Sequence, residues 1–138
     1  MSFDRVNIEF LHLDKYSKAF LREHLAPRTI ALLLNKLKMA DYRTRAVKRD
    51  DQLVFPIKIG RVGMEGNKSR REVKAGEIAY WPQSEALCVF IKDTTTYTPV
   101  NVLGLVEDLN FFKNLSMGAP VKLRFIQTDA DEEEPITI

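Results

Sequence analysis

The chain has 138 residues, of which 45% are hydrophobic and 29% charged, and its formal net charge is +2. These values are typical of a soluble globular protein and exclude disorder over the whole length. No apolar stretch approaches the roughly 20 residues of a membrane-spanning helix, and no secretory signal pattern follows Met1. We therefore expect a cytoplasmic protein with one domain, residues 1–128, followed by an acidic tail.

The first half of the chain predicts strands around one helix. Apolar and polar residues alternate over residues 6–13, as in a strand with one buried face. Residues 16–25 fit either a helical turn or a second strand, and we favour the strand. Pro27 precedes apolar residues with helical spacing, which predicts a helix over residues 27–38. Two alternating runs, residues 42–47 and 53–59, flank a polar turn and predict a hairpin.

The second half is richer in strands. Residues 60–76 carry glycines and basic residues and predict a long connection with a short strand near Val73. Residues 77–81, 86–91 and 100–107 predict the most buried strands, the last of them after a threonine-rich loop. Asp108 precedes a short helix that ends near Gly118, and residues 121–127 predict a final strand. About eight or nine strands with two short helices predict a mainly β fold, a closed antiparallel barrel.

The single cysteine and the two histidines give little sign of chemistry. Cys88 lies in the apolar run of residues 86–91, where an inert core thiol is expected. His12 and His24 have no neighbouring ligand residues at the spacing of a metal site. We therefore expect no metal and no cofactor.

Several segments occur together in the order of a known family. They are Gly76-Glu77-Ile78-Ala79-Tyr80-Trp81-Pro82, Ala86-Leu87-Cys88-Val89-Phe90, Pro99-Val100-Asn101-Val102-Leu103-Gly104 and Val121-Lys122-Leu123-Arg124-Phe125. In these segments the chain resembles the prokaryotic cyclophilin-like family of archaea and bacteria, most of whose members have no known function. The resemblance covers most of residues 5–127 and implies an antiparallel barrel closed by two helices, as in cyclophilins, whose relatives isomerise prolyl peptide bonds.

The residues for prolyl isomerisation are not recognisable. Isomerases of the cyclophilin kind use an arginine beside an apolar pocket to favour the twisted amide, against a barrier of about 18–20 kcal/mol. The diagnostic arginine followed by a Phe-Met-x-Gln run is absent, and the nearest counterpart is Phe55-Pro56-Ile57-Lys58-Ile59-Gly60-Arg61. Neither Lys58 nor Arg61 has the expected context, and lysine does not replace a planar guanidinium. A divergent peptidyl-prolyl isomerase therefore remains the alternative hypothesis.

The leading hypothesis is a binding module with a surface groove for a peptide or a small molecule near Trp81, Phe90 and Phe55. Adjacent strand residues point to opposite faces, so only one of Tyr80 and Trp81 is expected in the core. The amide of Asn101 would hold either a ligand or the loop backbone. The candidate ligand-binding residues are Phe55, Lys58, Arg61, Tyr80, Trp81, Phe90 and Asn101.

A third hypothesis concerns polyanions. Arg43, Arg45, Arg70 and Arg71 belong to two basic clusters that would contact RNA phosphates, although a solvated basic face explains them as well. Residues 129–138 carry five acidic residues and no basic ones, and a charge run of this kind is typically disordered. This acidic tail would cover the basic clusters and weaken polyanion binding.

Overall fold

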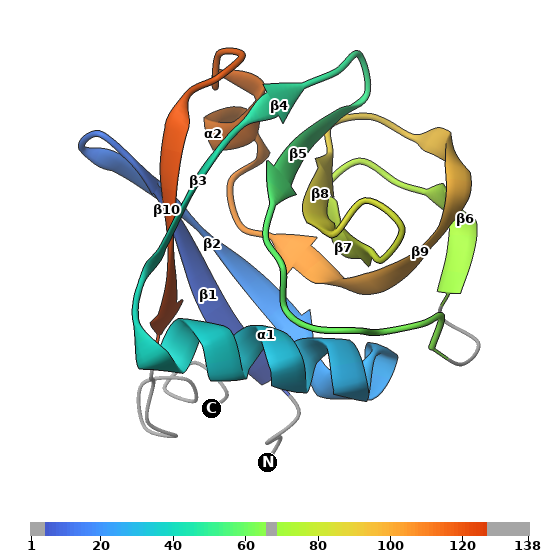
Figure 1. Ribbon diagram of the computed structural model, residues 1–138. Helices are drawn as coiled ribbons and strands as arrows, with labels where there is room; N and C mark the ends of the chain where they lie inside the picture. Colours follow the sequence, from blue (N-terminus) through green and yellow to red (C-terminus); the bar gives the residue numbers. More distant parts are fainter. Residues whose placement is uncertain (1–4, 66–68, 127–138) are drawn as a thin grey trace, which may run out of the picture.

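A computed structural model describes residues 5–65 and 69–126 and shows a mainly antiparallel β fold (Figure 1). The described helices are α1 (Pro27–Met39), α2 (Leu109–Lys113) and a short 3-10 helix, η1 (Glu23–Leu25). The described strands are β1 (Arg5–His12), β2 (Lys15–Arg22), β3 (Tyr42–Arg45), β4 (Val47–Lys48), β5 (Gln52–Pro56), β6 (Ser69–Val73), β7 (Glu77–Trp81), β8 (Ala86–Phe90), β9 (Thr94–Val106) and β10 (Pro120–Ile126).

The strands form one sheet in the order β3-β10-β1-β2-β9-β7-β8-β5-β4, and β6 pairs with β9. This path has two ends, so the expected closure of the barrel by strand pairing is not confirmed. The two end strands, β3 and β4, are consecutive in the chain and are separated by Ala46 alone. The backbone of Ala46 bonds the α2–β10 connection instead: its N–H donates to Ala119 O (2.9 Å), and its carbonyl accepts from Gly118 N (2.7 Å). The chain therefore changes partners at Ala46, from β10 to β5.

A side-chain hydrogen bond links β3 to β5, two strands that do not pair with each other and so leave the barrel open between them. Thr44 in β3 donates its hydroxyl to the carbonyl oxygen of Pro56 in β5, at 2.7 Å. Proline has no backbone N–H and cannot donate to a strand ladder, which limits regular pairing of β5 at this position. The hydrogen bond from Thr44 to Pro56 thus connects β3 to β5 where the two strands are not paired.

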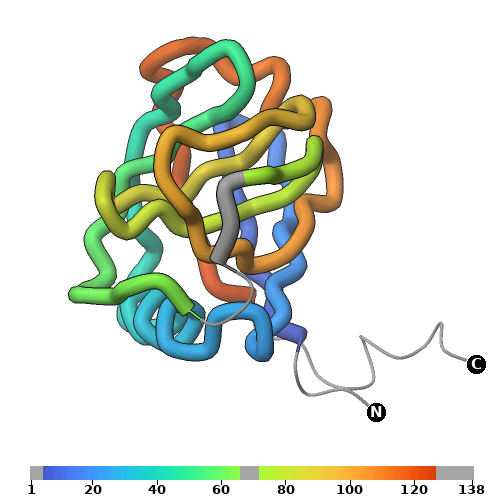
Figure 2. Tube along the Cα trace, turned by 90° about the vertical axis from the view of Figure 1, so that its right-hand side faces the viewer, coloured from blue at the N-terminus to red at the C-terminus, as the bar shows by residue number. Residues whose placement is uncertain are grey.

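The sheet is covered on both faces around β8, whose five residues are all buried. The main core contains the packed rings of Phe10, Phe55 and Phe112, whose centroids lie 5.0 to 6.0 Å apart. A second hydrophobic cluster lies on the other face: Val54, Val73, Ala79, Ala86, Cys88, Phe90, Val100 and Val102. The first half of β9 curves back beside β6, as Figure 2 shows, and the second half pairs with β7 and β2.

Most of the predicted elements are confirmed. The helix predicted over residues 27–38 is α1, with Ile30, Leu33, Leu34 and Leu37 buried, and Figure 1 shows it across one end of the sheet. The segment favoured as a second strand is β2, followed by η1. The predicted core position of Cys88 is also confirmed, because its side chain is fully buried and burial raises the pKa of the thiol to about 12. None of the described helices has the length and hydrophobicity of a membrane span.

Two predictions need correction. Only β4 forms the expected hairpin with β5, because residues 42–45 are β3 and pair with β10. The threonine-rich segment predicted as a loop is the start of β9, where Thr94 and Thr95 lie opposite Val73 and Glu72 of β6. Threonine is β-branched and suits an extended chain, so the polar composition was a misleading sign of a loop. The predicted acidic tail, residues 129–138, lies outside the described residues.

Candidate ligand site

The segment that follows β5 carries two of the predicted ligand-binding residues. We call residues 57–62 the strap, and Figure 1 shows the chain after β5 running along α1. Ile57 and Ile59 are buried in the main core, whereas Lys58 and Arg61 are exposed. Ile57, Lys58 and Ile59 alternate in the way that an extended segment presents its side chains to opposite sides. The isoleucines therefore anchor the strap and leave both cations in solvent.

Hydrogen bonds to neighbouring strands fix the start of the strap. The hydroxyl of Tyr80 donates to Ile57 O at 3.0 Å, and Ile57 N donates to Glu85 O at 3.0 Å. Burial, followed by the negative charge of Glu85, raises the pKa of Tyr80 to about 12. The phenol consequently keeps its proton and its role as a donor at neutral pH. Tyr80, predicted as a ligand contact, is instead a buried support of the strap.

Asn101 fixes the chain just beyond the strap. Its side chain is fully buried in β9, where Oδ1 accepts from Glu65 N (2.9 Å) and Nδ2 donates to Gly63 O (2.8 Å). Nδ2 also lies 3.2 Å from Thr29 Oγ1 in α1. Of the two roles considered for this amide, the structure supports the one in which it holds the loop backbone. A buried amide satisfied in this way specifies one loop position, because each unmade bond would be costly.

The same loop caps α1. The residue before the helix, Ala26, provides no side-chain cap, and Glu65 takes this role from a distant part of the chain. Its carboxylate accepts from Arg28 N at 3.0 Å and from Thr29 N at 2.6 Å. A carboxylate there satisfies N–H groups that have no partner inside the helix and interacts favourably with the helix dipole. The strap is thus held at both ends.

Between the strap and the β7–β8 turn lies an open hollow of about 500 Å³, which we call the strap hollow. Ligand sites commonly have volumes of about 300–1,000 Å³. The cations are Lys58 and Arg61, and the β7–β8 turn contributes a carboxylate from Glu85 and an amide from Gln83. The lining residues are Lys58, Gly60, Arg61, Val62, Pro82, Gln83 and Glu85. The arrangement offers donors and positive charge for an anionic group, with one carboxylate for a cationic group.

The other predicted residues do not line this hollow. Phe55 is fully buried in the main core and Phe90 in the second cluster, so neither of them forms a surface groove. Trp81 is half-buried, packs on the second cluster and donates Nε1–H to Thr98 Oγ1 at 2.6 Å. The expectation that only one of Tyr80 and Trp81 lies in the core is confirmed, because Tyr80 is buried in the main core and Trp81 is only partly buried beside the second cluster. Of the seven candidates, Lys58 and Arg61 come together, with Tyr80 and Asn101 as supports.

Sequence reasoning missed Glu65, Gln83 and Glu85. Glu85 follows Pro82 in the turn and has a φ of 51°, a conformation that glutamate rarely adopts. The polar turn between the two predicted strands could have indicated Gln83 and Glu85 as candidate ligand contacts. Glu65 gave no such signal, because its partner Thr29 lies 36 positions away in the sequence.

The predicted polyanion contacts are only partly described. Arg43 and Arg45 line a second open hollow of about 500 Å³ with Leu11, Leu13 and Lys122. Arg45 donates to Gly118 O at 2.9 Å. The side chains of Arg70 and Arg71 lie outside the described residues.

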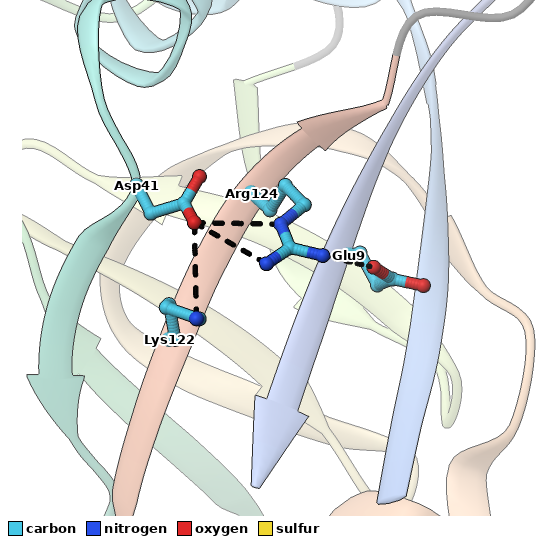
Figure 3. Close-up of polar contacts among 4 residues, drawn as sticks. All are labelled: Glu9, Asp41, Lys122 and Arg124. Carbon is cyan, nitrogen blue, oxygen red and sulfur yellow. Dashed lines mark hydrogen bonds and ion pairs between the residues drawn. The ribbon is translucent and has the colours of Figure 1, made fainter.

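Neighbouring basic residues are paired with acids. Figure 3 shows Arg124 between two carboxylates, 3.4 Å from Asp41 and 3.8 Å from Glu9, and Lys122 lies 3.8 Å from Asp41. These pairs are partly exposed, and such pairs contribute little stability individually. They also reduce the positive charge of this surface, so that Arg43 and Arg45 are its main cations.

Comparison with known proteins identifies the family. A model of the cyclophilin-like family matches residues 6–124. The chain belongs to this family. A search of curated proteins gave no match. The cyclophilin-like fold also appears in solved structures of low sequence identity, which show the fold alone.

Two of these structures are informative about the extent of the fold. The hypothetical protein AF2241 from Archaeoglobus fulgidus is 21% identical, with a TM-score of 0.72 over 89% of this chain and 96% of that one. McbB, solved in complex with tryptophan, is 19% identical, with a TM-score of 0.68 over 88% of this chain. The match covers 46% of the McbB chain, so this cyclophilin-like chain corresponds to about half of that protein.

Proposed function

We propose that this cyclophilin-like protein is a binding module that holds a small zwitterionic molecule, an amino acid or a short peptide, in the strap hollow. The observation that carries the proposal is the pair of cations, Lys58 and Arg61, on a strap anchored at both ends by buried polar groups. The anchored backbone of the strap loses little freedom when a ligand binds, which favours affinity.

Charge complementarity defines the ligand class. A ligand carboxylate would accept charge-assisted hydrogen bonds from Lys58 and Arg61, which are stronger than bonds between neutral groups. Glu85 on the facing turn would accept from a ligand ammonium. The presence of tryptophan in the McbB structure supports the choice of amino acids as the first probes.

Calorimetric titration with three related indoles tests the proposal. Tryptophan carries both charges, tryptamine lacks the carboxylate and indole-3-propionate lacks the amine. We expect tryptophan to bind most tightly. Substitution of Arg61→Gln should lower the affinity for tryptophan and for indole-3-propionate by roughly 10- to 100-fold, because a hydrogen bond to a charged group contributes about 1.5–3 kcal/mol.

Two further variants separate a specific site from general charge effects. Glu85→Gln should lower the affinity for tryptophan and leave the affinity for indole-3-propionate unchanged, since of these two ligands only tryptophan carries the ammonium. Lys92→Gln removes an exposed cation outside the hollow and should change neither affinity. Equal binding of all three indoles, or equal losses in Arg61→Gln and Lys92→Gln, would contradict the proposal.

The isomerase alternative has less support. A proline ring needs an apolar pocket beside the arginine, and three of the six residues that share the hollow with Arg61 are polar or charged: Lys58, Gln83 and Glu85. The hollow at Arg43 and Arg45 favours polyanion binding as a second candidate function. Retention on heparin that falls steeply with salt, and that is lost in Arg43→Gln, would support that candidate.

A further inference from the structure

A row of four side chains crosses the outer face of the sheet on β3, β10, β1 and β2, which neighbour one another in that order. The strand register places its members directly opposite one another, in the order Arg43, Lys122, Leu11 and Tyr16. Residues in such positions project from the same face. Phe10, next to Leu11 in β1, is buried in the main core, so the row lies on the opposite face of the sheet. We call these four residues the outer row.

The half of the outer row on β1 and β2 is apolar and accessible. Tyr16 is 55% exposed, and Leu13, in the turn between these two strands, is 85% exposed. The solvent face of an antiparallel sheet is normally polar. This half of the row therefore offers a partner an apolar surface that includes one aromatic ring.

The other half of the row is positively charged and hollowed. Arg43 and Lys122 line the second open hollow, of about 500 Å³, together with Arg45, Leu11 and Leu13. One N–H group of Arg45 donates to a backbone carbonyl at 2.9 Å, which fixes the guanidinium. A guanidinium has several N–H groups in a planar fork, so Arg45 keeps donors for a phosphate.

Carboxylates offset only part of this positive charge. Asp41 lies 3.8 Å from Lys122 and 3.4 Å from Arg124, as Figure 3 shows, so two cations share it. Within the part of the chain that the structure describes, neither Arg43 nor Arg45 forms an ion pair with a carboxylate. The two arginines of β3 therefore keep their charge for an anionic partner.

We infer that single-stranded nucleic acid binds along the outer row, with phosphates on Arg43 and Arg45 and a base stacked on the ring of Tyr16. The inference rests on the second candidate function, polyanion binding, and names its partner. Proteins that bind single strands combine a basic groove with aromatic rings on which bases stack. The bases of a duplex are paired and stacked on one another, so Tyr16 could not reach their faces.

The arrangement of the row favours nucleic acid over an anionic bilayer. A bilayer holds its charged headgroups and its hydrocarbon in separate layers, so a bilayer-binding surface places its apolar side chains deeper than its cations. Here the cations and the tyrosine lie side by side on one sheet face. Neighbouring strands are about 4.8 Å apart, so roughly 15 Å separate Arg43 from Tyr16. A single strand presents phosphates and bases side by side along its length, which suits this row.

Fluorescence anisotropy tests the inference in the full chain, with a fluorescein-labelled oligouridine of about ten nucleotides as the probe. Tyr16→Ala should lower the affinity for this probe by roughly 5- to 100-fold, the loss expected for one base stacked on an aromatic ring. Tyr16→Phe retains the ring and should retain the affinity. Tyr97→Ala is the matched control, because Tyr97 is 85% exposed on β9, outside the row, and its removal should leave the affinity unchanged.

The salt dependence of the same titration separates the phosphate contacts from the stacking contact. Arg43→Gln should lower the affinity and also reduce the slope of log affinity against log salt by about 0.7, the value for one phosphate contact to a single strand. Tyr16→Ala removes no charge and should leave this slope unchanged.

Other ligands show which results would overturn the inference. Equal affinities for oligouridine and for an RNA duplex of the same length would do so, because a duplex offers charge without accessible bases. An unchanged affinity in Tyr16→Ala would do so as well, whereas heparin retention lost in Arg43→Gln would still support polyanion binding. Sedimentation with phosphatidylserine-containing vesicles, without binding of oligouridine, would assign the row to a bilayer instead. None of these results affects the strap hollow, which shares no lining residue with the hollow at Arg43.

Discussion

Glu65 caps the first turn of α1 through Thr29, which lies 36 positions earlier in the sequence, and its carboxylate accepts from both the amide and the hydroxyl of that threonine. The contact joins the helix to the chain that follows the strap. It therefore links the stability of the helix to the position of Lys58 and Arg61.

Replacement of the cap should destabilise the fold. In Glu65→Ala, the amides of Arg28 and Thr29 lose their acceptor, and we expect a loss of about 1–2 kcal/mol in the free energy of unfolding. Glu65→Gln retains an acceptor oxygen and should lose less. Urea denaturation of the two variants measures the difference, and equal stability of Glu65→Ala and the parent chain would refute the role of the cap.

Asn101 offers a test of the buried polar network that needs almost no change in volume. Asn101→Asp replaces the donor Nδ2 with an oxygen that would face the carbonyl of Gly63, at a position where the side chain is fully buried. An unsatisfied buried group costs about 1–3 kcal/mol, and more when it is charged. We expect Asn101→Asp to be less stable at pH 7 than Asn101→Ala, as measured by thermal unfolding. The reverse order would show that the amide does not hold the loop.

Tyr80 and Cys88 should make the fold sensitive to alkali. Burial raises the pKa of Tyr80 from 10.0 to about 12 and that of Cys88 from 9.0 to about 12. Above pH 9 the unfolded chain therefore releases these protons before the folded chain does, so the unfolded state gains stability and the free energy of unfolding falls with pH. The stability that the protonated Tyr80 and Cys88 give the folded chain is fully present below pH 9 and is lost as the pH rises toward 12.

The variants Tyr80→Phe and Cys88→Ala remove these two titrations. Each should make the decline of the unfolding free energy between pH 9 and 12 shallower, by up to about 1.4 kcal/mol per pH unit. Urea titrations at several alkaline pH values measure this slope. A slope unchanged by both substitutions would mean that neither group titrates differently in the folded and unfolded chain.

Gly104 and Gly63 form a matched pair for steric effects. An alanine at position 104 would place Cβ 1.9 Å from a backbone oxygen, whereas a Cβ at Gly63 would have no neighbour within 4 Å. We expect Gly104→Ala to lose about 3 kcal/mol or more, since overpacking typically costs about 1–3 kcal/mol and this contact involves rigid backbone. Gly63→Ala should be nearly neutral. Similar melting temperatures for the two variants would argue against the close approach of β2 and β9.

Local patterns predicted the elements well and the site only in part. The helical spacing of Ile30, Leu33 and Leu37 depends on neighbours along the chain, and α1 is found where it was predicted. Alternation predicted that one of Tyr80 and Trp81 lies in the core, but it could not predict the second cluster beside Trp81, because a cluster on the opposite face of the sheet is a property of the tertiary fold. Aromatic residues such as Phe55 and Phe90 suit a ligand groove and a core equally, and here they are core.

The strap illustrates the same limit for function. Lys58 and Arg61 were identified because residues 55–61 are the nearest counterpart of the isomerase motif. The anchoring of the strap by Asn101 and Tyr80 depends on strands that are distant in sequence. Long-range hydrogen bonds of this kind leave no periodic pattern. The sequence therefore predicted the cations, and only the fold revealed the hollow that they share.

Chemical-shift mapping with tryptophan tests the central claim most directly. If the strap hollow is the binding site, the amide shifts of the full chain should change most at Lys58, Gly60, Arg61, Gln83 and Glu85, which line it. The same titration of a Lys58→Gln, Arg61→Gln double variant should show these changes greatly reduced. Shifts that concentrate elsewhere on the molecule, or that persist unchanged in the double variant, would contradict the account.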